Sequence, residues 1–128
     1  MRKEQVGKLI THDIKIELHE METILYFLKR GYNIELIVPS NTPQNKSPDI
    51  LMDGKFWEIK CPMGKSSLSV ESLFRKAACQ SENVIFDLRN FRGRGTDAVK
   101  TLTRKFKSSH RVKRLKIILK NGELQEFD

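Results

Sequence analysis

The dipeptide Asp53-Gly54 constrains the fold of this chain more than any other feature, because it separates two runs of strand-forming residues. Asp-Gly between two such runs is a strong signal for a β-hairpin with a two-residue turn. We therefore expect one strand over residues 49–52 and a second over 55–61. A turn of known length also fixes which side chains face each other across the hairpin.

Counting outward from the turn predicts the composition of one face of the hairpin. In this register Met52 faces Lys55, and three steps further Asp49 faces Glu58. Directly opposed residues have Cβ atoms about 5 Å apart. Lys60 follows Glu58 by two residues and therefore lies on the same face. The sequence thus predicts two carboxylates side by side, with an ammonium group next to them.

Two opposed acids disfavour a hairpin by up to about 1 kcal/mol, so folding alone does not explain them. A divalent cation removes the conflict, because carboxylate oxygens are the ligands that hard cations such as Mg²⁺ prefer. Lys60 can then orient or deprotonate an attacking water, or neutralise a phosphate group. We expect Asp49, Glu58 and Lys60 to form the active site of a nuclease that uses Mg²⁺ or Mn²⁺. The simpler interpretation makes Asp49 a turn residue after Pro48, with Glu58 and Lys60 as a surface ion pair.

A helical pattern before the hairpin offers further acids. Spacings of three and four between apolar residues predict a helix over about residues 6–30, which ends at Gly31. Glu17 and Glu20 lie on the flank of its apolar face, in a stripe that also holds Ile24, and either is a candidate third metal ligand. Acids on such a flank are more often surface residues with a buried stem. The residues expected to face the core are Ile14, Leu18, Met21, Leu25 and Leu28.

The remaining sequence alternates strand and helix patterns. We expect a strand over 32–38, a helix over 67–80, a buried strand over 83–88, a helix over 96–108 and a hairpin over 112–119 and 123–127. Ser66 precedes the second helix and is expected to cap it, with a phosphate contact as the alternative. The order of elements predicts an α/β fold over residues 1–128, a single domain with a central mixed β-sheet, flanking helices and a C-terminal β-hairpin.

The net charge of +8 points to a polyanionic partner. The distribution of the charges indicates which part of the chain would contact it. From Arg89 to Lys120 there are twelve Lys and Arg residues and a single acid, Asp97. We expect contacts with nucleic-acid phosphates that position the substrate without reading its sequence. The candidates for these contacts are Arg89, Arg92, Arg94, Lys100, Arg104, Lys105, Lys107 and Arg111.

Several classes of protein do not fit the sequence. No run of about 18 apolar residues is present, so no transmembrane helix or membrane anchor is expected. The first residues lack the apolar segment of a signal peptide, which favours action in the cytoplasm. The two cysteines, Cys61 and Cys79, give no disulfide framework. The three histidines lack the spacing of zinc ligands.

The quoted residues resemble a known superfamily. Pro48-Asp49 followed by Glu58-Ile59-Lys60 is similar to the motif of the PD-(D/E)XK nucleases. The segment from Glu20 to the pair Gly-Tyr at 31–32 looks like the first helix of that superfamily. This resemblance implies that Glu20 rather than Glu17 is the helix ligand, and that the fold has a PD-(D/E)XK core. It also makes Gln80 a candidate supporting residue, because the second helix often contributes one. The alternative for Gln80 is a contact that caps the helix.

A finer resemblance covers roughly residues 15–120. The segments GYNIELIVPS, SPDILMDGKFWEIKCPMGKSS and RKAACQSENVIFDLRN are similar to the tRNA-cleaving C-terminal toxin domain of contact-dependent growth inhibition proteins. That family implies metal-dependent cleavage of RNA, action in the cytoplasm of a target cell, and neutralisation by an immunity protein. Two other functions stay open on the sequence: a DNA endonuclease of repair, restriction or mobile-element type, and a non-catalytic nucleic-acid-binding module.

Overall fold

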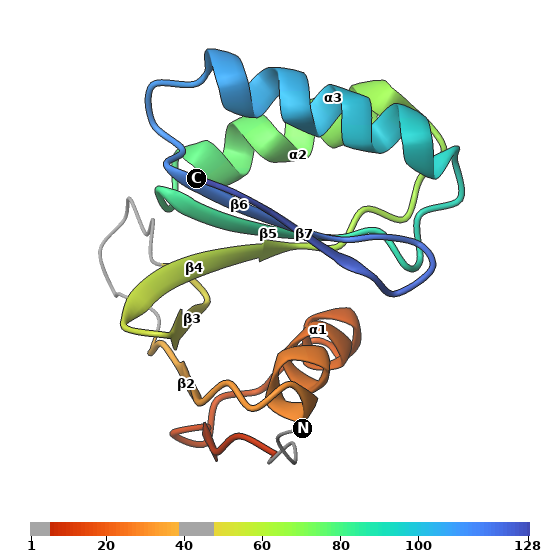
Figure 1. The fold of residues 1–128 in the computed structure, drawn as a ribbon. Helices are drawn as coiled ribbons and strands as arrows, with labels where there is room; N and C mark the ends of the chain where they lie inside the picture. Colours follow the sequence, from red (N-terminus) through yellow and green to blue (C-terminus); the bar gives the residue numbers. More distant parts are fainter. Residues whose placement is uncertain (1–5, 39–47) are drawn as a thin grey trace, which may run out of the picture.

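The structure, a computed structural model, describes residues 6–38 and 48–128 (Figure 1). In chain order the elements are β1 (Leu9–Ile10), α1 (Leu18–Lys29), β2 (Ile34–Leu36), β3 (Ile50–Met52), β4 (Lys55–Lys60), α2 (Ser67–Ala78), β5 (Asn83–Asp87), α3 (Gly95–Ser108), β6 (Arg114–Ile118) and β7 (Leu124–Phe127). The described residues thus form one α/β unit, as the sequence predicts. Within these residues, no helix has the length and apolar character needed to cross a membrane.

The strands form one mixed sheet in the spatial order β1 to β7, so neighbours in the sequence are also neighbours in the sheet. The pairs β1–β2, β4–β5 and β5–β6 are parallel, and the pairs β2–β3, β3–β4 and β6–β7 are antiparallel. Helix α1 lies on one side of the sheet, and α2 and α3 lie together on the other (Figure 1). This three-layer arrangement creates two separate apolar cores.

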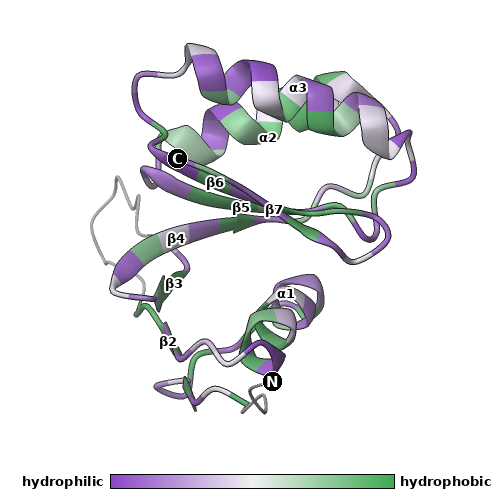
Figure 2. Cartoon of the chain, in the orientation of Figure 1, coloured by the Kyte–Doolittle hydropathy of each residue, from purple (hydrophilic) through white to green (hydrophobic). Residues whose placement is uncertain are grey.

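Alternation along the strands decides which core each side chain enters. In β5, Val84 and Phe86 belong to the core beneath α2 and α3, and Ile85 belongs to the core beneath α1. In β4, Trp57 and Ile59 belong to the α1 core. Figure 2 shows hydrophobic and hydrophilic residues following one another along the strands, and hydrophilic residues along much of α3. The alternation therefore directs Glu58 and Lys60 of β4 away from the α1 core.

The predicted hairpin is confirmed in detail. Ile50 pairs with Trp57 and Met52 pairs with Lys55, in the register obtained by counting from the turn. Asp53 and Gly54 have φ angles of 57° and 74°, which the two-residue turn requires. A left-handed conformation at both turn positions explains why the sequence places Asp-Gly there.

The predicted helix over residues 6–30 is wrong in its first half. Leu9–Ile10 instead form β1, which pairs in parallel with β2, and His12 and Asp13 adopt positive φ angles in the following turn. The backbone N–H of Gly7 donates to the carbonyl of Leu28 at 2.7 Å. These contacts are made to residues more than twenty positions away, so tertiary pairing overrides the local helical pattern.

The expected inner face of this helix is only partly right: Leu28 is buried, as predicted. Leu18 and Leu25 are 68% and 44% exposed, whereas Ile24, Phe27 and Thr23 are buried. The buried side of α1 is therefore the stripe that follows Glu20, which the sequence assigns to the flank. The other predicted elements agree with the structure except at their ends, where strands 32–38 and 112–119 shorten to Ile34–Leu36 and Arg114–Ile118.

Candidate active site

Asp49 lies immediately before β3 and is fixed against β4 through its backbone and its side chain. Its N–H donates to the carbonyl of Trp57 at 3.0 Å, and its Oδ2 accepts from the N–H of Ile59 at 2.8 Å. The carboxylate thus takes the place of a backbone carbonyl as acceptor, at the point where the hydrogen bonding between β3 and β4 ends. It also comes within hydrogen-bonding reach of the Glu58 carboxyl group. The structure therefore brings together the two acids that the register places opposite each other.

Glu58 is an unusually buried acid, at 3% exposure. Its Oε2 lies 3.1 Å from Nζ of Lys60. Its Oε1 is buried and accepts from no donor within residues 6–38 and 48–128. More than about 90% of buried polar groups in proteins have a partner, so this oxygen calls for an explanation.

Burial and mutual repulsion make the acids difficult to ionise together. Burial, reinforced by the charge of Asp49, raises the pKa of Glu58 to about 8, and the Lys60 ammonium opposes this shift. Burial also raises the pKa of Asp49 above its ordinary value, against the effect of its hydrogen bond from Ile59. Like-charged carboxylates sharing a site are strongly coupled, and a bound cation would relieve the repulsion between them.

Lys60 connects the hairpin to the end of α2. Its Nζ donates to Oε1 of Gln80 at 3.2 Å, in addition to its ion pair with Glu58. Gln80 follows the last turn of α2, where its N–H donates to the carbonyl of Ala77 at 2.9 Å. Gln80 therefore combines the two interpretations from the sequence: its backbone ends the helix and its side chain reaches the site.

The acids of α1 take different positions. Glu17 is the N-cap of the helix, and its Oε2 accepts from the N–H of Glu20 at 3.3 Å. Burial, followed by the charges of Asp49 and Glu17, raises the pKa of Glu20 to about 7, while Lys60 lowers it. Glu20 thus lies in the electrostatic field of the hairpin acids, and Glu17 has a capping role in the helix.

A cleft of about 270 Å³ joins these elements. Its lining includes Glu20 from α1, Asp49 from the start of β3, and Gln80 from the end of α2. Lys15 and Ile16, from the segment between β1 and α1, form another part of the wall. Lys15 is not among the candidates from the sequence, because the helical pattern places this residue inside a helix rather than in the segment that borders the cleft.

The described residues hold no group of three or more His, Cys, Asp or Glu side chains in an arrangement ready to bind a metal ion. Mg²⁺ does not require one, since it is often bound by one or two carboxylates, with water and substrate phosphates completing its shell. Asp49 and Glu58 supply such a pair. The buried Oε1 of Glu58, which accepts from no donor in the described parts of the chain, fits a hard divalent cation.

The other predicted residues lie outside this cleft. Ser66 caps α2, with its Oγ accepting from the N–H of Leu68 at 3.0 Å. Arg89 is engaged internally, donating to Asp87 at 2.8 Å. The remaining basic candidates lie on the loop before α3, on α3 itself and after it: Arg92, Arg94, Lys100, Arg104, Lys105, Lys107 and Arg111. Three of them, Lys100, Arg104 and Lys107, line one shallow depression on α3.

The fold and the site define a small α/β domain in which Glu20, Asp49 and Gln80 line one cleft, with Glu58 and Lys60 in contact with Asp49 and Gln80. Residues 46–124 match the family described as the contact-dependent growth inhibition CdiA C-terminal domain. The chain belongs to this family. The matched segment contains Asp49, Glu58, Lys60 and Gln80, and Glu20 precedes it.

The structure is also similar to a solved one, described as the CdiA-CT/CdiI toxin and immunity complex from Burkholderia pseudomallei. The TM-score is 0.72, and the match covers 95% of this chain and 99% of the other. The sequences are only 13% identical, so this likeness establishes a shared fold. No curated protein matches the chain in sequence.

Proposed function

We propose that this domain is a divalent-metal-dependent ribonuclease with a site of the PD-(D/E)XK type, and that it cleaves tRNA as the toxin domain of a contact-dependent growth inhibition system. The observation that carries the proposal is the buried carboxyl pair, Asp49 and Glu58. The oxygen Oε1 of Glu58 accepts from no donor among the described residues, and the second acid lies next to it. A sequence selected only for folding would seldom keep this arrangement.

In this proposal Asp49 and Glu58 hold Mg²⁺ or Mn²⁺, and Glu20 completes the acidic side of the cleft. The cation, when bound, supplies charge stabilisation and lowers the pKa of a coordinated water. Carboxylate oxygens suit these hard cations, and the described lining of the cleft contains no cysteine or histidine, which argues against zinc.

The remaining residues of the site act on the substrate. Lys60 offers an ammonium group held between Glu58 and Gln80, which can donate to a non-bridging phosphate oxygen or orient the attacking water. Gln80 keeps that ammonium group in place. Lys15 adds a positive charge to the wall of the cleft, where it can bind the phosphate next to the one that is cleaved.

Family membership supports the toxin role, and the similar solved structure is described as a toxin and immunity complex. We therefore propose a cognate immunity protein as a partner, and the cytoplasm of a target cell as the place of action. The basic residues of α3 supply a surface for RNA phosphates. RNA rather than DNA follows from the resemblance to tRNA-cleaving toxins.

The test is cleavage of total tRNA by the purified protein, with and without Mg²⁺ or Mn²⁺, and with the product ends mapped. We expect cleavage only with metal, and a loss of at least about 100-fold in Asp49→Ala. Asp97→Asn is the matched control, because it removes an exposed carboxylate on α3. Activity that persists in Asp49→Ala with EDTA contradicts the proposal.

The same assay on duplex DNA separates the alternatives. Cleavage of DNA with no cleavage of tRNA identifies a DNA endonuclease that uses the same residues. Salt-sensitive binding without cleavage and without metal affinity identifies a binding module.

A further inference from the structure

Glu20 differs from the other proposed site residues because a helix carries it. Asp49, Glu58 and Lys60 belong to the hairpin, so their relative positions follow from strand register. The position of Glu20 depends instead on how α1 docks on the sheet. Apolar packing at Ile24 and its neighbours is not directional, so it leaves rotation and sliding of the helix less well defined.

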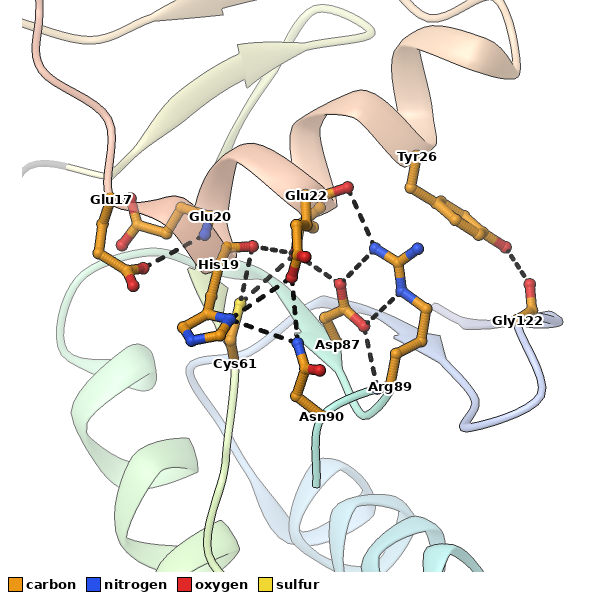
Figure 3. A network of polar contacts seen from close by, with 11 residues as sticks. Glu17, His19, Glu20, Glu22, Tyr26, Cys61, Asp87, Arg89, Asn90 and Gly122 are labelled. Atoms are coloured by element: carbon orange, nitrogen blue, oxygen red, sulfur yellow. Dashed lines mark hydrogen bonds and ion pairs between the residues drawn. The ribbon is translucent and has the colours of Figure 1, made fainter. Parts of the chain in front are cut away.

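A polar cluster fastens α1 to the end of β5 (Figure 3). Asp87 is 3% exposed, and its Oδ2 accepts from Oγ1 of Thr23 at 2.6 Å. Arg89 donates to both oxygens of Asp87 at 2.8 to 3.1 Å, through its backbone N–H and its guanidinium group. The same guanidinium donates to the carbonyl of Glu22 at 3.1 Å. Two consecutive residues of α1, Glu22 and Thr23, are thus held by one buried carboxylate and its arginine.

The place of Thr23 on the helix connects this cluster to the site. Thr23 follows Glu20 by three residues, so the two side chains share one side of α1. The Thr23 side chain is buried, and its hydrogen bond depends on both distance and direction. Rotation or sliding of α1 would break this bond before it disrupted the apolar contacts. A displacement of about 1 Å at a catalytic group can lower a rate by about 100-fold.

We propose that Thr23 and Asp87 are positioning residues of the active site, which hold Glu20 beside Asp49 by fixing the rotation of α1. This inference rests on the proposed function, because it assigns Glu20 its place in that site. Thr23 is the better residue to test. Replacing it leaves the ion pair between Asp87 and Arg89 intact, whereas replacing Asp87 would leave Arg89 without its partner.

A residue that only held the helix to the sheet would behave differently, and α1 offers a comparison. The hydroxyl of Tyr26 donates to the carbonyl of Gly122 at 2.7 Å. Tyr26 lies towards the opposite end of α1 from Glu20 (Figure 3). Tyr26→Phe removes this bond and keeps the aromatic ring, over which Arg89 and Arg30 lie. It therefore weakens the docking of α1 at a point remote from the site.

The experiment compares Thr23→Val, Thr23→Ser and Tyr26→Phe with the wild type, at a temperature where all four are folded. Mn²⁺ affinity is measured by calorimetry, and cleavage of total tRNA under single-turnover conditions. We expect Thr23→Val to weaken Mn²⁺ binding and slow cleavage by about 10- to 100-fold, as loss of a residue that orients a ligand usually does. Thr23→Ser retains the hydroxyl and should stay within about threefold of the wild type. Tyr26→Phe should lower only the melting temperature.

A double variant tests whether Thr23 acts through Glu20. In a Glu20→Gln background, adding Thr23→Val should change Mn²⁺ affinity and rate by less than about threefold, because the group it positions is already altered. Effects that multiply in the double variant, or equal losses in Thr23→Val and Tyr26→Phe, overturn the inference. So does a wild-type affinity in Thr23→Val. If the wild type itself neither binds Mn²⁺ nor cleaves RNA, the proposed function is contradicted as well. Failure of the proposed function is thus distinguished from failure of the positioning role alone.

Discussion

The side-chain amide oxygen of Gln80 accepts a hydrogen bond of 3.2 Å from the ammonium group of Lys60, and this bond joins the hairpin to the end of α2. Lys60 also pairs with Glu58 at 3.1 Å, so its ammonium group has two fixed neighbours. A lysine side chain is otherwise long and freely rotating. The bond that Lys60 donates to Gln80 therefore fixes the position of the positive charge beside Glu58.

Loss of this bond should affect the chemical step more than substrate binding. In Gln80→Leu we expect kcat for tRNA cleavage to fall about tenfold, with KM changed by less than about threefold, because Lys60 loses a positioning partner. Cys79→Ala is the control, since it alters the preceding, exposed residue. Steady-state kinetics provide the measurement. A rise in KM at constant kcat would instead assign Gln80 to substrate binding.

Lys15 should contribute to binding rather than to chemistry. It lines the cleft from the segment before α1, and an exposed lysine there can meet a substrate phosphate. We expect Lys15→Ala to raise KM about three- to tenfold with little change in kcat. Lys29→Ala removes an exposed lysine from the last turn of α1 and is the matched control. Equal KM values in the two variants would exclude a special role for Lys15.

The basic depression on α3 should account for part of the salt dependence of RNA binding. Each phosphate contact contributes about 0.7 to 0.9 to the slope of log K against log salt concentration. The double variant Lys100→Ala, Lys107→Ala should therefore reduce this slope by about 1 to 2. The double variant Lys8→Ala, Lys29→Ala has the same net charge and should change the slope less. Fluorescence anisotropy with labelled tRNA at several salt concentrations measures it, and identical slopes in both variants would remove α3 from the interface.

Local sequence signals account for the parts of the site that lie on the hairpin. Asp53-Gly54 determines the turn, and the turn places Asp49 next to Glu58 through contacts between residues close in sequence. The burial of Glu58 could be anticipated only in part, because its depth depends on how α2 and β5 pack against β4. The sequence predicts which acids meet, and the tertiary structure determines how difficult they are to ionise.

Non-local contacts explain what the sequence could not predict. The hydrogen bond from Thr23 to Asp87 spans 64 residues, and it lies on the buried side of α1, in the stripe that follows Glu20. Helical periodicity instead favours the side with Leu18 and Leu25. It depends only on the spacing of apolar residues and contains no information about the surface against which the helix packs. The same limitation concealed Lys15, which lies between β1 and α1 and forms part of the cleft wall.

The raised pKa of Glu58 gives the last prediction, a fall in stability with rising pH when no metal is present. The folded protein binds this proton up to about pH 8, while the unfolded chain releases it near pH 4.5. Between these values the folded state holds more protons, so the free energy of unfolding decreases as the pH rises. The pKa of Glu20, raised to about 7, makes the free energy of unfolding fall further between about pH 4.5 and 7. Urea unfolding at pH 5 to 8 with EDTA, compared with Glu58→Gln, measures the effect.

Between pH 5 and 8 the free energy of unfolding of the wild type should fall by on the order of 1 kcal/mol or more relative to that of Glu58→Gln. The reason is that the glutamine has no proton to release. Mg²⁺ should restore most of the loss in the wild type at pH 8 and have little effect at pH 5, where proton binding competes with the cation. Glu58→Gln should keep only the smaller pH dependence that Glu20 contributes, and its free energy of unfolding should respond little to Mg²⁺. A constant difference between the two proteins across this range would mean that Glu58 ionises normally, and the carboxyl pair would then provide no driving force for metal binding.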